Sequence, residues 1–184
     1  MKATLIVLLL VLPIKGFAPN ITKLVKHDRH VVEVKKNLKE ENKELVRFLK
    51  KLAHYESRNT IDTVNSIGAM GLYQLMPIAL KDINYTGTVD EFLKDSVLQT
   101  KCVIKVMKKN KRYLKHYCKN YKQYIGKEIH GVKITYSGIL AAVHLGGINN
   151  IKKFFNEGYN AKDCNMSIKD YMRIFGGFNL EKII

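Results

Sequence analysis

Residues 45–59, LVRFLKKLAHYESRN, decide the fold of this chain. Steps of four, three and four residues place four of their side chains on one stripe of an α-helix, namely Leu45, Leu49, Leu52 and Glu56. The apolar face of the predicted helix therefore ends in a carboxylate. Burying such a group is costly unless it has a use. Because burial disfavours the ionised form of a carboxyl group, Glu56 is a candidate general acid.

Spacing alone leaves an ordinary role for Glu56 open. A glutamate near a helix end also forms surface ion pairs, and Lys51 and Arg58 both stand within reach along the chain. The residues that surround the stretch must separate these two interpretations.

Hydrophobic periodicity predicts a mainly α fold with at most a small β element. We expect helices at residues 37–55, 72–83, 95–117, 137–145, 148–155 and 167–174, and a loop or short hairpin at 121–135. Asn37 with Glu40, and Ser167 with Asp170, have the spacing of capping boxes. Pro77 is awkward within a helix, so a kink or a new helix start is expected there. The 184 residues, 46% of them hydrophobic, suffice for one compact domain.

The N-terminus has the pattern of a cleaved signal peptide, residues 1–18. Lys2 precedes an apolar run at residues 3–12, and small residues occupy the positions that a signal peptidase recognises, Gly16 and Ala18. A buried core helix is the alternative. The run is shorter than the roughly 20 residues of a transmembrane helix, and no later segment is long or apolar enough to span a membrane. We expect an exported protein, periplasmic or extracellular, with residues 19–36 as an N-terminal lead-in.

The chain is strongly basic, with a formal net charge of +16. Removing residues 1–18 leaves 30 basic side chains against 16 acidic ones. Such a surplus supports solubility or attracts a polyanion, such as the cell wall, a membrane surface or nucleic acid. The lysines are spread along the chain without a nucleic-acid recognition motif, so no nucleic-acid partner is expected.

Three cysteines, Cys102, Cys118 and Cys164, allow one disulfide and one free thiol in an oxidising compartment. None forms a Cys-x-x-Cys pair, so we expect no metal site. Cys102 lies in an apolar helical stretch and fits an ordinary core position.

Three ordered motifs distinguish between the interpretations of Glu56. His54-Tyr55-Glu56-Ser57-Arg58-Asn59 is followed by GAMGLYQLMP at residues 68–77, and then by ILAAVHLGG at residues 139–147. Together they resemble the soluble lytic transglycosylase family of the lysozyme-like superfamily, over roughly residues 43–155. That family has a Glu-Ser dipeptide at a helix end, a Gly-Leu-Met-Gln-type motif, and an Ala-Ala-Tyr-Asn-Ala-Gly segment, which here takes an Ala-Ala-x-His-Leu-Gly-Gly form.

The resemblance implies a lysozyme-like domain at residues 37–184, with a groove for peptidoglycan strands, no cofactor and no metal. By position, Glu56 would protonate the glycosidic oxygen, and Ser57 would contact the glycan or steady the acid. Gln74 would hydrogen-bond a sugar or Glu56. Gly68 and Gly71 would let the backbone pass close to the groove, although a turn and a helix start also explain them.

Two departures from the family pattern concern the predicted substrate-binding residues. Tyr73 replaces the methionine before the motif glutamine, and Val143-His144 replaces the Tyr-Asn pair. The family's tyrosine lies near the acid and is missing here, so the residue that takes its role is open. Tyr136 would supply a hydroxyl, or His144 would face the groove; a core histidine is the alternative for His144.

The reaction has two possible outcomes. Hydrolysis usually needs two carboxylates, and the motifs supply only Glu56, with Asp62 as the nearest candidate partner. A lone acid favours transglycosylation, in which the muramyl 6-hydroxyl attacks intramolecularly and leaves a 1,6-anhydro end. A lysozyme-type muramidase, a non-catalytic wall-glycan-binding protein and a basic nucleic-acid-binding protein are the rivals. A monomer is expected.

Overall fold

The computed structural model describes residues 43–163 and 166–184, which all belong to the second of two units of the chain, Lys39–Ile184. The predicted signal peptide, the lead-in at 19–36, the capping box of Asn37 and the third cysteine, Cys164, lie outside the described residues. Within them the protein is mainly helical, as predicted, with two small antiparallel hairpins, of which only the first was expected.

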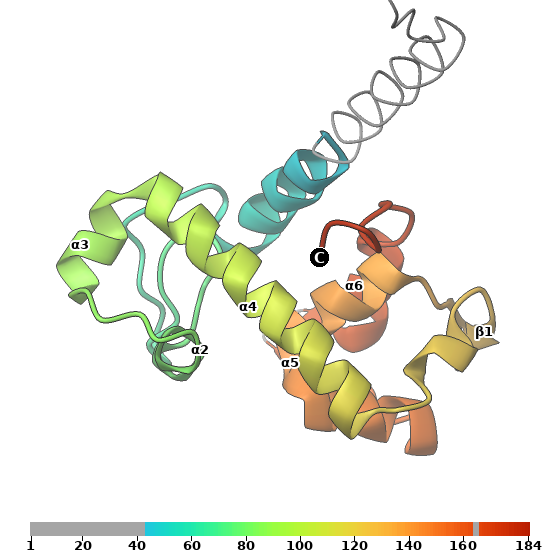
Figure 1. Ribbon diagram of the computed structural model, residues 1–184. Coiled ribbons are helices and arrows are strands. Elements are labelled where there is room, and N and C mark those ends of the chain that lie inside the picture. The colour runs from blue at the N-terminus through green and yellow to red at the C-terminus, as the bar shows by residue number, and fades with distance from the viewer. Residues whose placement is uncertain (1–42, 164–165) are drawn as a thin grey trace, which may run out of the picture. The chain divides into compact units, whose positions relative to one another are not determined.

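The elements follow one another in the order that Figure 1 shows. After a helix at residues 43–57 come α2 (Pro77–Asp82), α3 (Val89–Lys94), α4 (Ser96–Tyr117), the short 3-10 helix η1 (Tyr121–Tyr124), β1 (Glu128–Ile129), β2 (Val132–Lys133), α5 (Tyr136–Glu157), β3 (Lys162–Asp163), β4 (Met166–Ser167) and α6 (Ile168–Ile174). β1 pairs with β2, and β3 pairs with β4.

The first described helix buries the predicted apolar stripe. Leu45, Leu49 and Leu52 are 9%, 5% and 0% exposed. The helix extends to Ser57, so Glu56 lies in its last turn. Arg58 and Asn59 then take left-handed backbone angles, φ 53° and 65°, and donate main-chain hydrogen bonds back to His54 and Ala53. This sharp exit fixes the end of the helix one residue beyond Glu56.

The predicted helix at residues 72–83 is wrong in its first half. Residues 71–75 form a tight turn, in which Gly71 and Gln74 have φ of 73° and 45° and the main chain of Met70 pairs with that of Leu75. The helix starts only at Pro77, the first residue of α2. A proline lacks the N–H that helix interiors need but fits the first turn, where that donor has no helical acceptor.

Two side-chain caps organise the next segment. Thr88 and Glu91 form a capping box at α3, a helix that the periodicity did not predict. Asp95 caps α4 by accepting hydrogen bonds from the main-chain N–H groups of Val97 and Leu98. The predicted helix at 95–117 is therefore confirmed within one residue, because a capping residue stands just outside the helix that it stabilises.

The two helices predicted at 137–145 and 148–155 are the two halves of α5, which a kink at Gly147 separates. There φ is 73° and ψ is 169°, so the second half of α5 leaves in a new direction. The hairpin predicted within residues 121–135 is present as β1 and β2. α6 begins after Ser167 and has the predicted capping box with Asp170.

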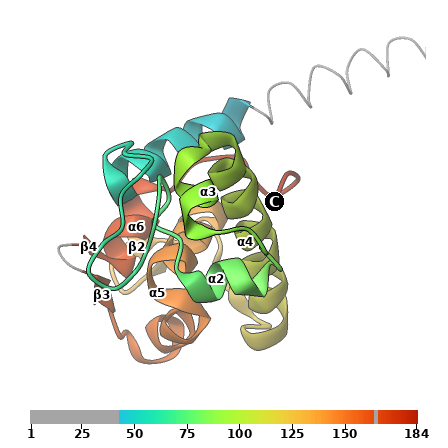
Figure 2. The same cartoon turned by 90° about the vertical axis from the view of Figure 1, so that its left-hand side faces the viewer.

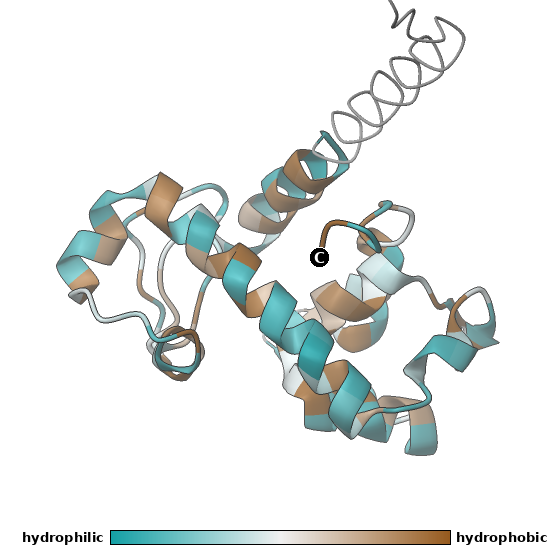
Figure 3. Cartoon of the chain, viewed as in Figure 1, coloured by the Kyte–Doolittle hydropathy of each residue, from teal (hydrophilic) through white to brown (hydrophobic). Residues whose placement is uncertain are grey.

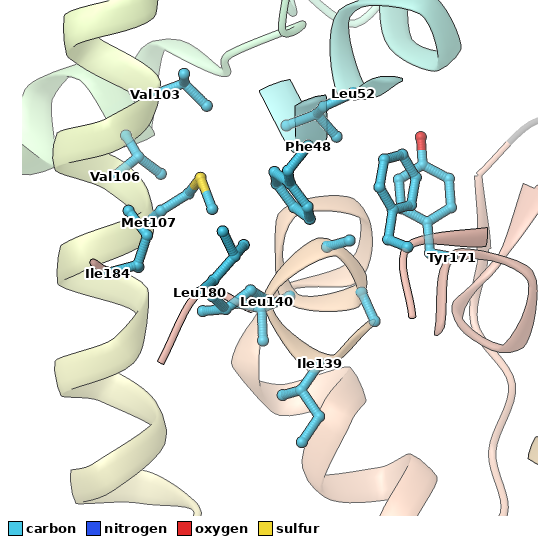
Figure 4. Packing of buried hydrophobic residues seen from close by; sticks show 14 of the residues in the cluster. Phe48, Leu52, Val103, Val106, Met107, Ile139, Leu140, Tyr171, Leu180 and Ile184 are labelled. Atoms are coloured by element: carbon cyan, nitrogen blue, oxygen red, sulfur yellow. The ribbon is translucent and has the colours of Figure 1, made fainter. Parts of the chain in front are cut away.

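The core lies between the first helix, α4, α5, α6 and the C-terminal segment. Figure 4 shows Met107 of α4, Leu140 of α5 and Phe48 of the first helix within one cluster of buried side chains, to which Leu180 also belongs. Phe48, Leu180 and Phe175 are 0% exposed. The C-terminal residues therefore help to hold the helix that carries Glu56.

In the described part of the chain, Cys102 and Cys118 carry free thiols. No helix of residues 43–163 or 166–184 has both the length and the apolar character needed to cross a membrane.

Candidate active site

Glu56 forms part of the wall of a pocket of about 270 Å³. The pocket lies between the loop that follows the first helix, the middle of α5, the β3–β4 hairpin and α6; Figure 2 shows the loop beside β3 and β4. Its lining residues are Tyr55, Glu56, Asn65, Ile67, Ala69, Gln74, Met76, His144, Leu145, Asp163, Met166 and Tyr171. Its size approaches the lower end of small-molecule sites, about 300 Å³.

The carboxylate is largely shielded from solvent. The side chain of Glu56 is 12% exposed, in agreement with its predicted place at the end of the apolar stripe. Its Oε1 accepts a hydrogen bond from the Tyr171 hydroxyl at 2.7 Å. No hydrogen bond from the described residues reaches Oε2, so this oxygen is left without a protein partner there.

Tyr171 comes from α6 and is 2% exposed. Burial raises the pKa of its hydroxyl far above the usual range, and the neighbouring charge of Glu56 raises it further. The raised pKa therefore favours the protonated phenol, which donates its hydrogen bond to Glu56. Sequence reasoning missed Tyr171, because a tyrosine on the buried face of a short helix has the pattern of a core residue.

His144 of α5 approaches the same oxygen of Glu56, and its side chain is 6% exposed. Its Nε2 is 2.8 Å from the carbonyl oxygen of Tyr73, and because a carbonyl only accepts hydrogen bonds, Nε2 carries the proton. The same Nε2 is 3.6 Å from Oε1 of Glu56, too far for a hydrogen bond but near enough for electrostatic interaction. His144 thus joins α5 to the loop of residues 68–76, here called the motif loop, beside the acid.

The motif loop places Gln74 at the pocket. Its Nε2 donates to the carbonyl of Gly71, which holds the side chain across the tight turn. Ser57, by contrast, has structural partners: its hydroxyl lies 3.0 Å from the Leu72 carbonyl and accepts from the main-chain N–H of Thr60. Ser57 therefore fastens the end of the first helix to the motif loop, and contact with a glycan stays a prediction.

A fully buried amide, Gln99 of α4, also holds this loop in place, although it does not line the pocket. It accepts from the main-chain N–H of Leu72 at 2.7 Å and donates to the carbonyls of Ile61 and Phe92. Its side chain comes so close to Gly71 that a Cβ there would lie 2.5 Å from Gln99 Oε1. Gly71 is therefore required by close approach as well as by its positive φ, whereas Gly68 has only the positive φ. The sequence signal that could have identified Gln99 is its position as a polar residue on the apolar stripe of α4.

Of the predicted site residues, Glu56, Gln74 and His144 line the pocket, whereas Ser57, Gly71, Tyr73 and Tyr136 do not. The Tyr73 side chain is 5% exposed, and its hydroxyl forms a hydrogen bond with Thr100. Only the main-chain carbonyl of Tyr73 takes part in the site, where it accepts a hydrogen bond from His144. The Tyr136 hydroxyl donates to the carbonyl of Ile184. The hydroxyl beside the acid therefore belongs to Tyr171 and not to Tyr136.

A second carboxylate, Asp163 of β3, lines the pocket. Sequence reasoning had pointed to Asp62 instead, which is exposed and is not among the lining residues. Asp163 matters because a second carboxylate is what hydrolysis would use. Among residues 43–163 and 166–184, no group of three or more His, Cys, Asp and Glu side chains could hold a metal ion.

Comparison with known proteins identifies the family to which the chain belongs. No curated protein and no solved structure matches the chain. The sequence profile of the family described as "Transglycosylase SLT domain" matches residues 33–163, more than half of the chain, and this range includes Glu56, Gln74 and His144. The chain therefore belongs to the transglycosylase SLT domain family.

Proposed function

We propose that this protein is a peptidoglycan lytic transglycosylase that cleaves the β-1,4 bond between MurNAc and GlcNAc. The observation that carries the proposal is the shielded carboxylate of Glu56 at the pocket wall, with Oε1 bonded to Tyr171 and Oε2 left for the substrate. The family match supports the substrate class.

In the proposed first step, Oε2 of Glu56 gives its proton to the glycosidic oxygen as the bond to C1 of MurNAc breaks. Tyr171 stabilises the carboxylate that results, because its protonated hydroxyl donates to Oε1. In the second step, the C6 hydroxyl of the same MurNAc attacks C1 and its proton passes to Glu56. The acid is regenerated, and the products are a GlcNAc 4-hydroxyl and a 1,6-anhydro-muramyl end.

Lysozyme-type hydrolysis is the second candidate, and Asp163 is the observation that favours it. In this reaction Asp163 would take a proton from water while Glu56 protonates the leaving oxygen, and the product would have a reducing end. Transglycosylation is our first choice because Asp163 is exposed and has no described partner that orients it.

Mass spectrometry of the released muropeptides separates the candidates. Wild-type protein should release anhydro ends, Glu56→Gln should release nothing, and Asp163→Asn should keep the anhydro product. Reducing ends that disappear in Asp163→Asn would establish hydrolysis instead. Equal clearing of a peptidoglycan suspension by wild type and Glu56→Gln would favour the non-catalytic glycan-binding alternative.

We also propose that the protein is exported and that residues 1–18 are cleaved off as a signal peptide. The mature protein would be a monomer. The N-terminal pattern of Lys2, an apolar run and Ala18 supports export, and the peptidoglycan substrate agrees with an envelope location. Mass measurement of the protein recovered outside the cytoplasm tests the cleavage site. An intact Met1 in that fraction would contradict it.

A further inference from the structure

The distribution of charge on α4 is markedly uneven. Residues 96–127 contain ten lysine and arginine side chains and no aspartate or glutamate. Five of these basic residues lie three or four positions apart: Lys101, Lys105, Lys108, Arg112 and Lys115, here called the basic stripe. At 3.6 residues per turn they fall within an arc of about 80°, along about 21 Å of helix. All five are exposed.

Two basic residues next to the stripe, Lys109 and Lys111, have hydrogen-bonded partners. Lys109 pairs with Asp82 at 2.6 Å, and Lys111 donates to main-chain carbonyls near the C-terminus. Across residues 43–163 and 166–184, no hydrogen bond or ion pair involves a side chain of the basic stripe. Like charges at these spacings repel one another and destabilise the helix. Lys115 is well placed in the last turn of α4, and Arg112 interacts electrostatically with Asp82, but the stability of α4 does not explain a row of five like charges.

The stripe is also separate from the proposed chemistry. None of its residues is among those lining the pocket of Glu56. The opposite face of α4, with Val103, Val106 and Met107, is buried in the core. In Figure 3 hydrophilic colour dominates the C-terminal half of α4. A partner can therefore lie along the stripe without displacing any part of the fold.

We propose that the basic stripe is a docking surface for an anionic phospholipid membrane. Five ammonium and guanidinium groups that point in one direction along a straight helix can meet a flat layer of headgroups together, and each adds to the attraction. Val97 continues the same line at the start of α4, and its 59% exposed side chain offers an apolar contact to the headgroup region.

The composition of the stripe favours a membrane over a nucleic acid. Four of its five residues are lysines, which act as hydrated point charges, whereas specific phosphate recognition favours arginine. The stripe contains no tyrosine, phenylalanine or tryptophan on which bases could stack. A diffuse anionic surface requires neither feature.

Sedimentation with vesicles tests the proposal on the full chain. Vesicles of equal parts phosphatidylglycerol and phosphatidylcholine are compared with pure phosphatidylcholine, which measures any binding by the apolar residues 3–12. The stripe variant is Lys105→Gln, Lys108→Gln, Arg112→Gln. The matched control, Lys50→Gln, Lys81→Gln, Lys133→Gln, removes as much charge from exposed residues outside α4. Circular dichroism verifies that both variants fold.

The stripe variant should lose affinity for the anionic vesicles by about fivefold per charge, hence on the order of 100-fold. The control variant should lose much less, and cleavage of soluble glycan should stay unchanged in both. Equal losses in the two variants would show that net charge alone is responsible and overturn the proposal. So would equal binding of wild type to both vesicle types, or tighter binding to single-stranded DNA at the same salt.

Discussion

The hydroxyl of Tyr171 donates a hydrogen bond of 2.7 Å to Oε1 of Glu56, although 115 positions separate the two residues. This contact joins the last described helix of the chain to the first. It leaves the other carboxylate oxygen for the substrate, so we expect it to matter for rate more than for folding.

Tyr171→Phe should lower kcat for glycan cleavage on the order of 10- to 100-fold, because a hydrogen bond to a charged group contributes about 1.5–3 kcal/mol. Tyr136→Phe is the matched control, since it removes a buried hydroxyl that bonds to the Ile184 carbonyl, away from the pocket. Initial rates on purified glycan strands measure the difference. Equal rates for the two variants would contradict a role for Tyr171 in positioning the acid.

His144→Ala should raise KM more than it lowers kcat. The carbonyl of Tyr73 would lose its buried partner, at a cost of about 1–3 kcal/mol in the free energy of unfolding, and the neighbouring Gln74 would lose its fixed place in the pocket. His144→Gln, which keeps a donor, should restore part of the affinity. Replacing the exposed His116 should change neither constant. A fall in kcat with KM unchanged would instead indicate that His144 acts directly on Glu56.

Gly71→Ala should destabilise the protein more than Gly68→Ala, although both glycines have a positive φ. For Gly68 the cost is that of a left-handed alanine, about 1–2 kcal/mol, because no atom lies within 4 Å of the added Cβ. At Gly71 the Cβ would also displace the Gln99 amide from Leu72 and break a buried hydrogen bond. Denaturant unfolding of the two variants gives the comparison, and equal free energies of unfolding would refute this account of Gly71.

Asp82→Asn should make stability less sensitive to acid. The hydrogen bond from Lys109 holds the pKa of the Asp82 carboxyl below 3.8, its ordinary value, and the hydrogen bond from Tyr113 adds to this effect. Because the folded-state pKa is lowered, the stabilisation is complete above about pH 4 and is lost as the pH falls through the folded-state pKa. The side chain is 36% exposed, so the difference should stay below about 1 kcal/mol. Urea unfolding from pH 2 to pH 7 measures it; parallel pH profiles for wild type and variant would contradict the assignment.

The sequence predicted what periodicity and local rules determine. The spacing of Leu45, Leu49 and Leu52 placed Glu56 at the inner end of a helix. The capping box of Ser167 marked the start of α6, and Gly146-Gly147 marked the break in α5. The sequence left two choices open at Pro77, because a proline is compatible with both a kink and a first turn. The turn at Gly71 was mistaken for helix, since its apolar residues have helical spacing while tertiary contacts with Gln99 determine its backbone.

The partners of Glu56 could not be predicted in the same way. Tyr171 and Asp163 approach the acid only because α6 and the β3–β4 hairpin pack beside the motif loop, and no local pattern encodes that contact. Tyr171 also lies beyond residues 33–163, the range that the family profile matches. His144 could be predicted as a candidate site residue. Its hydrogen bond to the Tyr73 carbonyl could not, because it depends on the turn at residues 71–75, which the periodicity predicted as helix.

The long separation between Glu56 and Tyr171 also has a consequence for the order in which the protein is made. Synthesis proceeds from the N-terminus, so the helix of Glu56 leaves the ribosome well before α6 exists. Until residue 171 has been added and α6 has docked, a nascent chain contains the acid without the phenol that orients it. The last part of the domain to be translated is thus the part that completes the site.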